Sequence, residues 1–147
     1  MRKLFIILLF CFVLAPQVQA AYVLPYPSFM PGNKIYKITR IVDELKAYWY
    51  WGPIAQKKYH MMLADKYLVE AKVLFEYGQY LLAADALERS NEHIVQASTD
   101  EQKAEHVRVL MGVKGMVPQD FTWTPEKSDA TELSLHTMID EAIKIRQ

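Results

Sequence analysis

Three residues near the C-terminal end are spaced as metal ligands on a helix could be. Glu132, His136 and Asp140 follow one another at intervals of four residues. On one helix this spacing places the three side chains along a single stripe. Carboxylates and imidazole are metal ligands, so the stripe is a candidate metal site. Carboxylates beside an exposed histidine are also common on solvated helix faces. We favour that interpretation and predict no cofactor.

The sequence lacks the common motifs of catalysis. It contains no Gly-x-Ser-x-Gly, no Gly-rich phosphate loop and no His-Glu-x-x-His, and its one cysteine, Cys11, lies in an N-terminal apolar run. Asp65 and Glu70 are five residues apart, so they do not face the same point on one helix. We interpret Glu70 as a paired structural carboxylate. The sequence therefore predicts a non-enzymatic protein, in which no catalytic role falls to the histidines His60, His93, His106 and His136.

A second candidate site is a run of four consecutive aromatic residues: Tyr48, Trp49, Tyr50 and Trp51. Successive residues of a helix are about 100° apart, so four rings cannot all face one core. We favour stacking of this helix end on Tyr26 and Pro27. The alternative is an aromatic platform, together with Tyr26, that binds a glycan strand or the apolar helix of a partner. Membrane contact is a third option, which no basic cluster supports.

The N-terminal twenty residues have the pattern of a secretory signal peptide. Arg2 and Lys3 precede an apolar run from Leu4 to Ala15, and the small or modest side chains of Val18-Gln19-Ala20 suit a signal peptidase. The run is shorter than the roughly 20 residues that span a bilayer, so an uncleaved anchor is the less favoured alternative. Cleavage leaves a chain without cysteine or transmembrane helix. We expect it outside the cytoplasm, either secreted, periplasmic or bound to the cell envelope.

Composition predicts one globular domain. The chain has 147 residues, of which 52% are hydrophobic and 23% charged. The formal net charge is zero, so no basic surplus attracts nucleic acid. We expect the partner to be another protein or an envelope component, and a homo-oligomer is compatible with this composition.

Residues 21–33 form a Pro-rich lead before the helical domain at 34–147. Its prolines favour extended backbone. We predict that the lead packs on the bundle through its larger side chains, Tyr22, Tyr26, Phe29 and Met30. The alternative is a recognition strip for an aromatic-lined groove.

Apolar periodicity predicts the helices. The first ends near Gly52 and is expected to bury one seam: Ile35, Ile38, Ile41, Val42, Leu45 and Trp49. Pro53 begins a second helix with its own seam: Ile54, Met61, Ala64, Leu68, Ala71 and Phe75. Gly78 then joins it to a third helix in an antiparallel hairpin.

Two further helices follow. One begins at a capping box formed by Ser98 with Glu101 or by Thr99 with Gln102, and the last spans about Leu135 to Ile145. Residues 119–127 form a connector, and no strand pattern competes. The predicted fold class is all-α, a small bundle of four to five helices with a central antiparallel hairpin.

The chain resembles the secreted bacterial family called domain of unknown function 5667 in two stretches, "VLPYPSFMPGNKIYKITRIVDEL" and "MLADKYLVEAKVLFEYGQY". The similarity covers roughly residues 23–94, and its motif residues here are Pro25, Pro27, Asp65, Lys66 and Glu70. It implies a helical architecture, export and a structural role for these residues, but no activity. Locally, "LFEYGQYLLAADAL" is similar to a tetratricopeptide junction, although no second copy occurs.

These observations predict an exported non-enzymatic helical protein that acts as an interaction module or is associated with the cell envelope. The alternative is an extracytoplasmic protein that binds a small ligand, a glycan or a metal.

Overall fold

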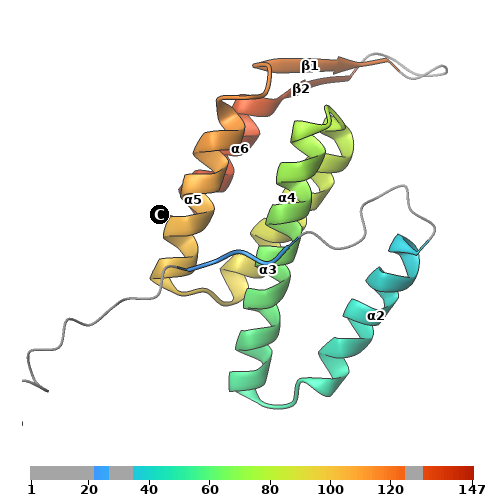
Figure 1. The fold of residues 1–147 in the computed structure, drawn as a ribbon, viewed down its shortest axis with the longest axis vertical. Coiled ribbons are helices and arrows are strands. Elements are labelled where there is room, and N and C mark those ends of the chain that lie inside the picture. Colours follow the sequence, from blue (N-terminus) through green and yellow to red (C-terminus); the bar gives the residue numbers. More distant parts are fainter. Residues whose placement is uncertain (1–21, 27–34, 125–130) are drawn as a thin grey trace, which may run out of the picture.

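The computed structural model describes residues 22–26, 35–124 and 131–147. Its elements are α2 (Tyr36–Trp49), α3 (Pro53–Glu76), α4 (Tyr80–Gln96), α5 (Asp100–Lys114), β1 (Asp120–Trp123), β2 (Thr131–Ser134) and α6 (Leu135–Ile145). Figure 1 shows α3 to α6 side by side and α2 beside the lower part of α3. The predicted helical bundle is confirmed. The predicted signal peptide and residues 21 and 27–33 of the lead lie outside the described residues.

The central hairpin of α3 and α4 is antiparallel, as predicted (Figure 1). Pro53 occupies the first turn of α3, where its missing N–H is not needed. After α3 ends, Gly78 has a φ of 69°, a left-handed conformation that glycine adopts without steric cost. The amide of Gln79 then donates to the carbonyl of Leu74 at 2.9 Å, which closes the turn.

The main hydrophobic core lies between α3, α4, α5 and α6. Its fully buried members include Leu68, Leu87, Leu110, Leu135 and Ile139. The predicted seam of α3 is confirmed at Phe75, whose side chain is 4% exposed, but it is wrong at Ile54. Ile54 is exposed because α3 has 24 residues and α4 only 17, so the first turns of α3 project beyond the hairpin partner (Figure 1).

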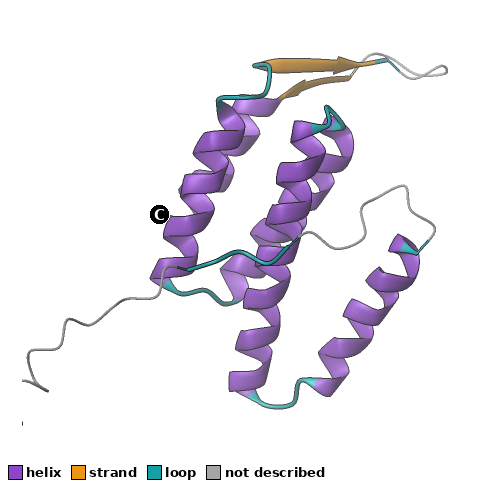
Figure 2. Cartoon of the chain, viewed as in Figure 1, coloured by secondary structure: helices purple, strands orange, loops and turns teal. Residues whose placement is uncertain are grey.

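A two-stranded antiparallel sheet interrupts the helices, so all-α was an overstatement (Figure 2). Phe121 on β1 pairs with Leu133 on β2, and the Phe121 ring lies 5.0 Å from that of Tyr80. Each strand has four residues, too few for alternation to reveal it in the sequence. The predicted connector therefore contains β1.

The described part of the lead, residues 22–26, crosses the bundle as a short extended segment (Figure 1). The hydroxyl of Tyr22 donates to Asp65 on α3 at 2.5 Å, and Leu24 packs against the main core. Tyr26, in contrast, is 93% exposed. The predicted packing of the lead is confirmed for Tyr22 and wrong for Tyr26. Phe29 and Met30 lie outside the described residues.

Candidate functional site

Helix α2 is turned opposite to the sequence prediction, so its apolar seam faces outward. The seam residues Ile38, Ile41, Val42, Leu45 and Trp49 are between 43% and 82% exposed. We call these five residues the outer face. Apolar side chains at this spacing normally contact a core. In the described part of the chain nothing covers them.

Polar contacts hold the opposite face of α2 against α3. Asp43, which lies outside the predicted apolar seam, is buried and forms ion pairs with Lys66 of α3 and with Lys46. The hydroxyl of Tyr59 donates to the carbonyl oxygen of Asp43 at 3.0 Å. A buried carboxylate needs such partners, and α3 supplies them. This requirement turns the apolar face of α2 toward solvent.

A second contact fixes the N-terminal end of α2. The hydroxyl of Tyr36 donates to Glu70 Oε1 at 2.5 Å. Glu70 is buried in α3, and burial raises the pKa of its carboxyl above the ordinary value, although the hydrogen bond from Tyr36 opposes that rise. The pairing that we predicted for Glu70 is thus confirmed. Its partner is a residue far away in the sequence.

The aromatic run divides between the core and the surface. Tyr48, Trp49 and Trp51 are 79%, 82% and 87% exposed, and with Leu45 they line an open hollow at the end of α2. We call these three rings the aromatic tip. Tyr50 points inward instead, and its ring lies 5.5 Å from that of Tyr59.

The favoured stacking of this helix end on Tyr26 is wrong, because Tyr26 is almost fully exposed and does not line the hollow. Pro27, the other predicted stacking partner, lies outside the described residues. The aromatic tip and the outer face form one continuous apolar surface, since Trp49 belongs to both and Leu45 lines the hollow.

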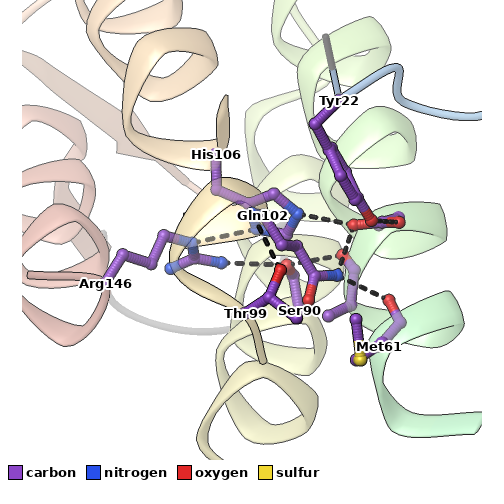
Figure 3. Close-up of polar contacts among 9 residues, drawn as sticks. Tyr22, Met61, Ser90, Thr99, Gln102, His106 and Arg146 are labelled. Carbon is purple, nitrogen blue, oxygen red and sulfur yellow. Dashed lines mark hydrogen bonds and ion pairs between the residues drawn. The ribbon is translucent and has the colours of Figure 1, made fainter. Parts of the chain in front are cut away.

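A buried polar network includes Tyr22, the first described residue of the lead (Figure 3). Asp65 Oδ1 accepts hydrogen bonds from Gln102 Nε2 at 2.5 Å and from His106 Nε2 at 2.8 Å, while its second oxygen accepts from Tyr22. Arg146, after α6, donates from Nε to His106 Nδ1 at 3.2 Å. Helices α3 and α5 and the lead thereby meet at one carboxylate, and His106 links it to Arg146.

The charge states in this network follow from its geometry. His106 Nδ1 accepts from Arg146 and Nε2 donates to Asp65, so the imidazole is neutral. Burial lowers the pKa of His106, and it lowers that of Arg146 to about 10, which leaves the guanidinium charged at neutral pH. Arg146 also donates to Ser90 Oγ at 2.9 Å and to Asn91 Oδ1 at 2.5 Å. His106 has no exposed surface that could meet a substrate. Its hydrogen bonds join α5 to Asp65 of α3 and to Arg146, which indicates a structural role.

A pair of histidines lies between α3 and α4. His60 Nδ1 and His93 Nδ1 are 3.0 Å apart, and the ring of Tyr67 stacks on His93 at 5.7 Å. Burial, with a smaller contribution from His60, lowers the pKa of His93 to about 4. One of the two imidazoles donates and the other accepts. Because its pKa is about 4, His93 is neutral at neutral pH.

The expectation that Glu132, His136 and Asp140, the candidate metal ligands, share one stripe of the last helix is wrong. Glu132 lies on β2, outside α6, whereas His136 and Asp140 lie on α6. Asp140 is paired with Lys114 at 2.6 Å, and His136 Nε2 is 3.2 Å from the carbonyl oxygen of Val117. The ranges that the structure describes contain no group of three or more histidine, cysteine, aspartate or glutamate residues that could hold a metal ion.

Of the motif residues behind the family resemblance, three make structural contacts. Asp65 is the centre of the buried network, Lys66 pairs with Asp43, and Glu70 accepts from Tyr36. Pro25 is exposed, and Pro27 lies outside the described residues. Sequence reasoning missed Gln102, His106 and Arg146. The one available signal was an acidic residue, Asp65, within an apolar stretch of α3.

Comparisons with protein families, curated proteins and solved structures returned no match for this chain. The resemblance to domain of unknown function 5667 therefore stays a prediction. Among the helices that the structure describes, none is both long and apolar enough to cross a bilayer.

Proposed function

We propose that this chain is an exported, non-enzymatic helical protein that binds another protein through the outer face of α2 and the aromatic tip. The observation that carries the proposal is the exposure of the apolar seam of α2. Three aromatic rings, each about four-fifths exposed, leave on the order of 500 Å² of apolar surface. The aliphatic side chains of the outer face enlarge it further. A typical monomer exposes patches of roughly 300–600 Å², so a larger one indicates an interaction site.

Two features favour a protein partner. The surface is elongated along a helix, and its aliphatic residues recur at helical spacing, which suits the groove or helix of another protein. Tyrosine and tryptophan are also enriched at the energetically dominant positions of protein interfaces. The buried network around Asp65 serves the fold in this proposal and takes no part in binding.

A glycan-binding protein is the second candidate, and the hollow at the aromatic tip favours it. Sugar rings stack on tryptophan and tyrosine, and Tyr48, Trp49 and Trp51 surround one hollow. The aliphatic residues Ile38 and Ile41 lie beyond such a platform and would remain uncovered. A pull-down on immobilised envelope glycans tests this candidate, and retention that is lost in Trp51→Ala would support it.

Site-specific photo-crosslinking in the producing cells tests the main proposal. A photoreactive amino acid at position 45 should crosslink to a protein, because Leu45 lies at the centre of the surface. The same probe at position 111 is the matched control, since Met111 is 58% exposed on α5, which lies on the other side of the bundle from α2 (Figure 1). Equal crosslinking at both positions, or none at position 45, would contradict a binding role for α2.

Export is tested separately. We expect the product outside the cytoplasm to begin at Ala21, which mass spectrometry of the intact protein can establish. A product that retains Met1 would indicate an anchored protein instead.

A further inference from the structure

We propose that the protein bound to the outer face of α2 is a second copy of this chain, with the two α2 helices packed antiparallel. This inference rests on the proposed function and names the partner of the same surface. In a symmetric dimer one patch meets its own copy, so the patch must complement itself in shape and charge. The outer face meets both requirements.

The spacing of the outer face suits a helix as its partner. Ile38 and Leu45 are seven residues apart, and Ile41 lies between them. Val42 and Trp49 are also seven residues apart. Apolar residues repeating at intervals of three and four, and hence every seven, form the seam along which two helices pack. A seam of this kind is long and narrow. It therefore fits another α2 better than a compact ligand.

Charges along one edge of the seam favour antiparallel self-pairing. Lys37 and Glu44 are seven residues apart and therefore lie on the same edge, and both are exposed. Neither forms an ion pair with another described residue. When two α2 helices pack antiparallel about a two-fold axis near Ile41, Lys37 of each copy lies opposite Glu44 of the other. In a parallel pair both charges would face the apolar edge of the partner helix.

The exposed area is of the size that a dimer needs. A stable interface buries about 800 Å² on each partner. In the register that pairs Lys37 with Glu44, Leu45 of one copy lies opposite Tyr36 of the other. The aromatic tip, which exposes on the order of 500 Å², therefore extends past the partner's α2 and adds to the interface where another part of the partner covers it. Four aliphatic residues of the outer face, Ile38, Ile41, Val42 and Leu45, are each about half exposed and contribute the rest.

A lipid surface fits the same face less well. Helices that bind membranes carry mostly basic residues beside the apolar face, because the lipid surface is anionic. Here Glu44 offsets Lys37 on the flanking edge, and Asp43 is buried with its own cations. Opposite charges on one edge complement a second copy and give no attraction to an anionic surface.

Charge-swap variants test the pairing directly. The exported protein, as the cells process it, is examined by sedimentation equilibrium over a range of concentrations. We expect a dimer whose dissociation constant rises about tenfold in Lys37→Glu and in Glu44→Lys, because each substitution replaces two attractive pairs by two repulsive ones. An equimolar mixture of these two variants should form heterodimers of native affinity, since the opposite charges face each other again. The double variant, with both substitutions, should recover self-association.

Two apolar variants complete the test. Leu45→Asp should make the protein monomeric at every concentration, because it places a carboxylate in the apolar seam of each copy. Met111→Asp on α5 is the control and should leave the dimer intact, because α5 lies on the other side of the bundle from α2 (Figure 1). Circular dichroism establishes that both variants fold. Since Leu45 is exposed, its substitution does not disturb the core.

The other outcomes overturn the inference in distinguishable ways. A monomeric protein that still crosslinks from position 45 to a different protein overturns the dimer and leaves the proposed function standing. Binding to anionic vesicles that is stronger in Glu44→Lys and weaker in Lys37→Glu would identify a lipid surface and overturn the dimer. A monomer that neither crosslinks nor binds vesicles would overturn both the dimer and the proposed function. A dimer that is insensitive to both charge swaps would overturn the antiparallel pairing.

Discussion

Asp65 is a buried carboxylate whose role is to join segments that are distant in the sequence. It accepts hydrogen bonds from Tyr22 in the lead and from Gln102 and His106 on α5. Charged groups are rarely buried without partners, because the loss of hydration is costly. Here the partners come from two other parts of the chain, so the carboxylate is satisfied only when these parts are in place.

Removing this carboxylate should therefore destabilise the protein markedly. Asp65→Ala leaves His106 Nε2 buried without its acceptor and removes one of the two acceptors of Gln102 Nε2, and we expect a loss of about 3 kcal/mol in the free energy of unfolding. Urea unfolding measures this. The matched control is Asp140→Ala, which removes an exposed ion pair with Lys114 and should cost less than about 1 kcal/mol. Similar losses in the two variants would mean that the buried network contributes little.

The histidines make the stability depend on pH. Folding lowers the pKa of His106, and that of His93 to about 4, mainly through burial. Below about pH 6.5 the unfolded chain binds protons that the folded chain does not, so the free energy of unfolding should fall as the pH decreases from about 6.5 towards 4. The raised pKa of Glu70 has the opposite effect. Above the ordinary pKa of a glutamate the folded chain binds more protons than the unfolded chain, so this group lowers the free energy of unfolding as the pH rises.

Titration of the imidazole signals by NMR checks the His93 contribution. The His93 ring should become protonated only near pH 4, and His93→Gln should flatten the dependence of stability on pH between about 6.5 and 4. Protonation of His93 near pH 6.5 would show that its ring is not buried as described.

At the scale of elements, two glycines should respond to the same substitution with opposite signs. Gly78 has a φ of 69°, where a side chain is strained, so Gly78→Ala should destabilise the protein by about 1 kcal/mol. Gly112 lies within α5, and an added Cβ would meet nothing within 4 Å. Gly112→Ala should therefore stabilise the protein by about 0.5–1 kcal/mol. Thermal unfolding of both variants measures the two shifts, and equal signs would contradict the assigned turn.

For the whole molecule, we predict that α2 opens locally more easily than the other helices, because it takes no part in the main core. The helices α3 to α6 share the main core, whereas α2 is held mainly by Asp43, Tyr36 and the aromatic packing of Tyr50. Few buried apolar contacts make local opening easy. At low protein concentration, amide hydrogens of α2 should exchange more than about tenfold faster than those at the centre of α4. Mass spectrometry of exchanged peptides measures this, and equal protection would indicate that α2 belongs to the main core.

The concentration dependence of the same measurement bears on the proposed dimer. Pairing of two α2 helices would slow exchange in α2 as the concentration rises, while α4 would be unaffected. Exchange in α2 that is independent of concentration, in a sample shown to be dimeric, would place the interface elsewhere.

The sequence by itself determined the elements whose ends depend on local contacts. Pro53 begins α3, Gly78 follows its end, and the hydroxyl of Thr99 caps α5 by accepting from the amide of Gln102 at 3.2 Å. Each feature involves residues a few positions apart, so residue type alone predicts it. The core seam of α3 around Phe75 was predictable for the same reason, because its periodicity is local.

The tertiary structure alone decided which way α2 faces. Periodicity shows that Ile38, Ile41 and Leu45 share a side, but it does not show what covers that side. The buried partners of Asp43 on α3 turn the apolar side outward. The same holds for Asp65, His106 and Arg146, which are far apart in the chain and meet only in the folded protein. Local patterns carry no information on such pairings, since a hydrogen bond across the bundle depends on how whole helices are placed.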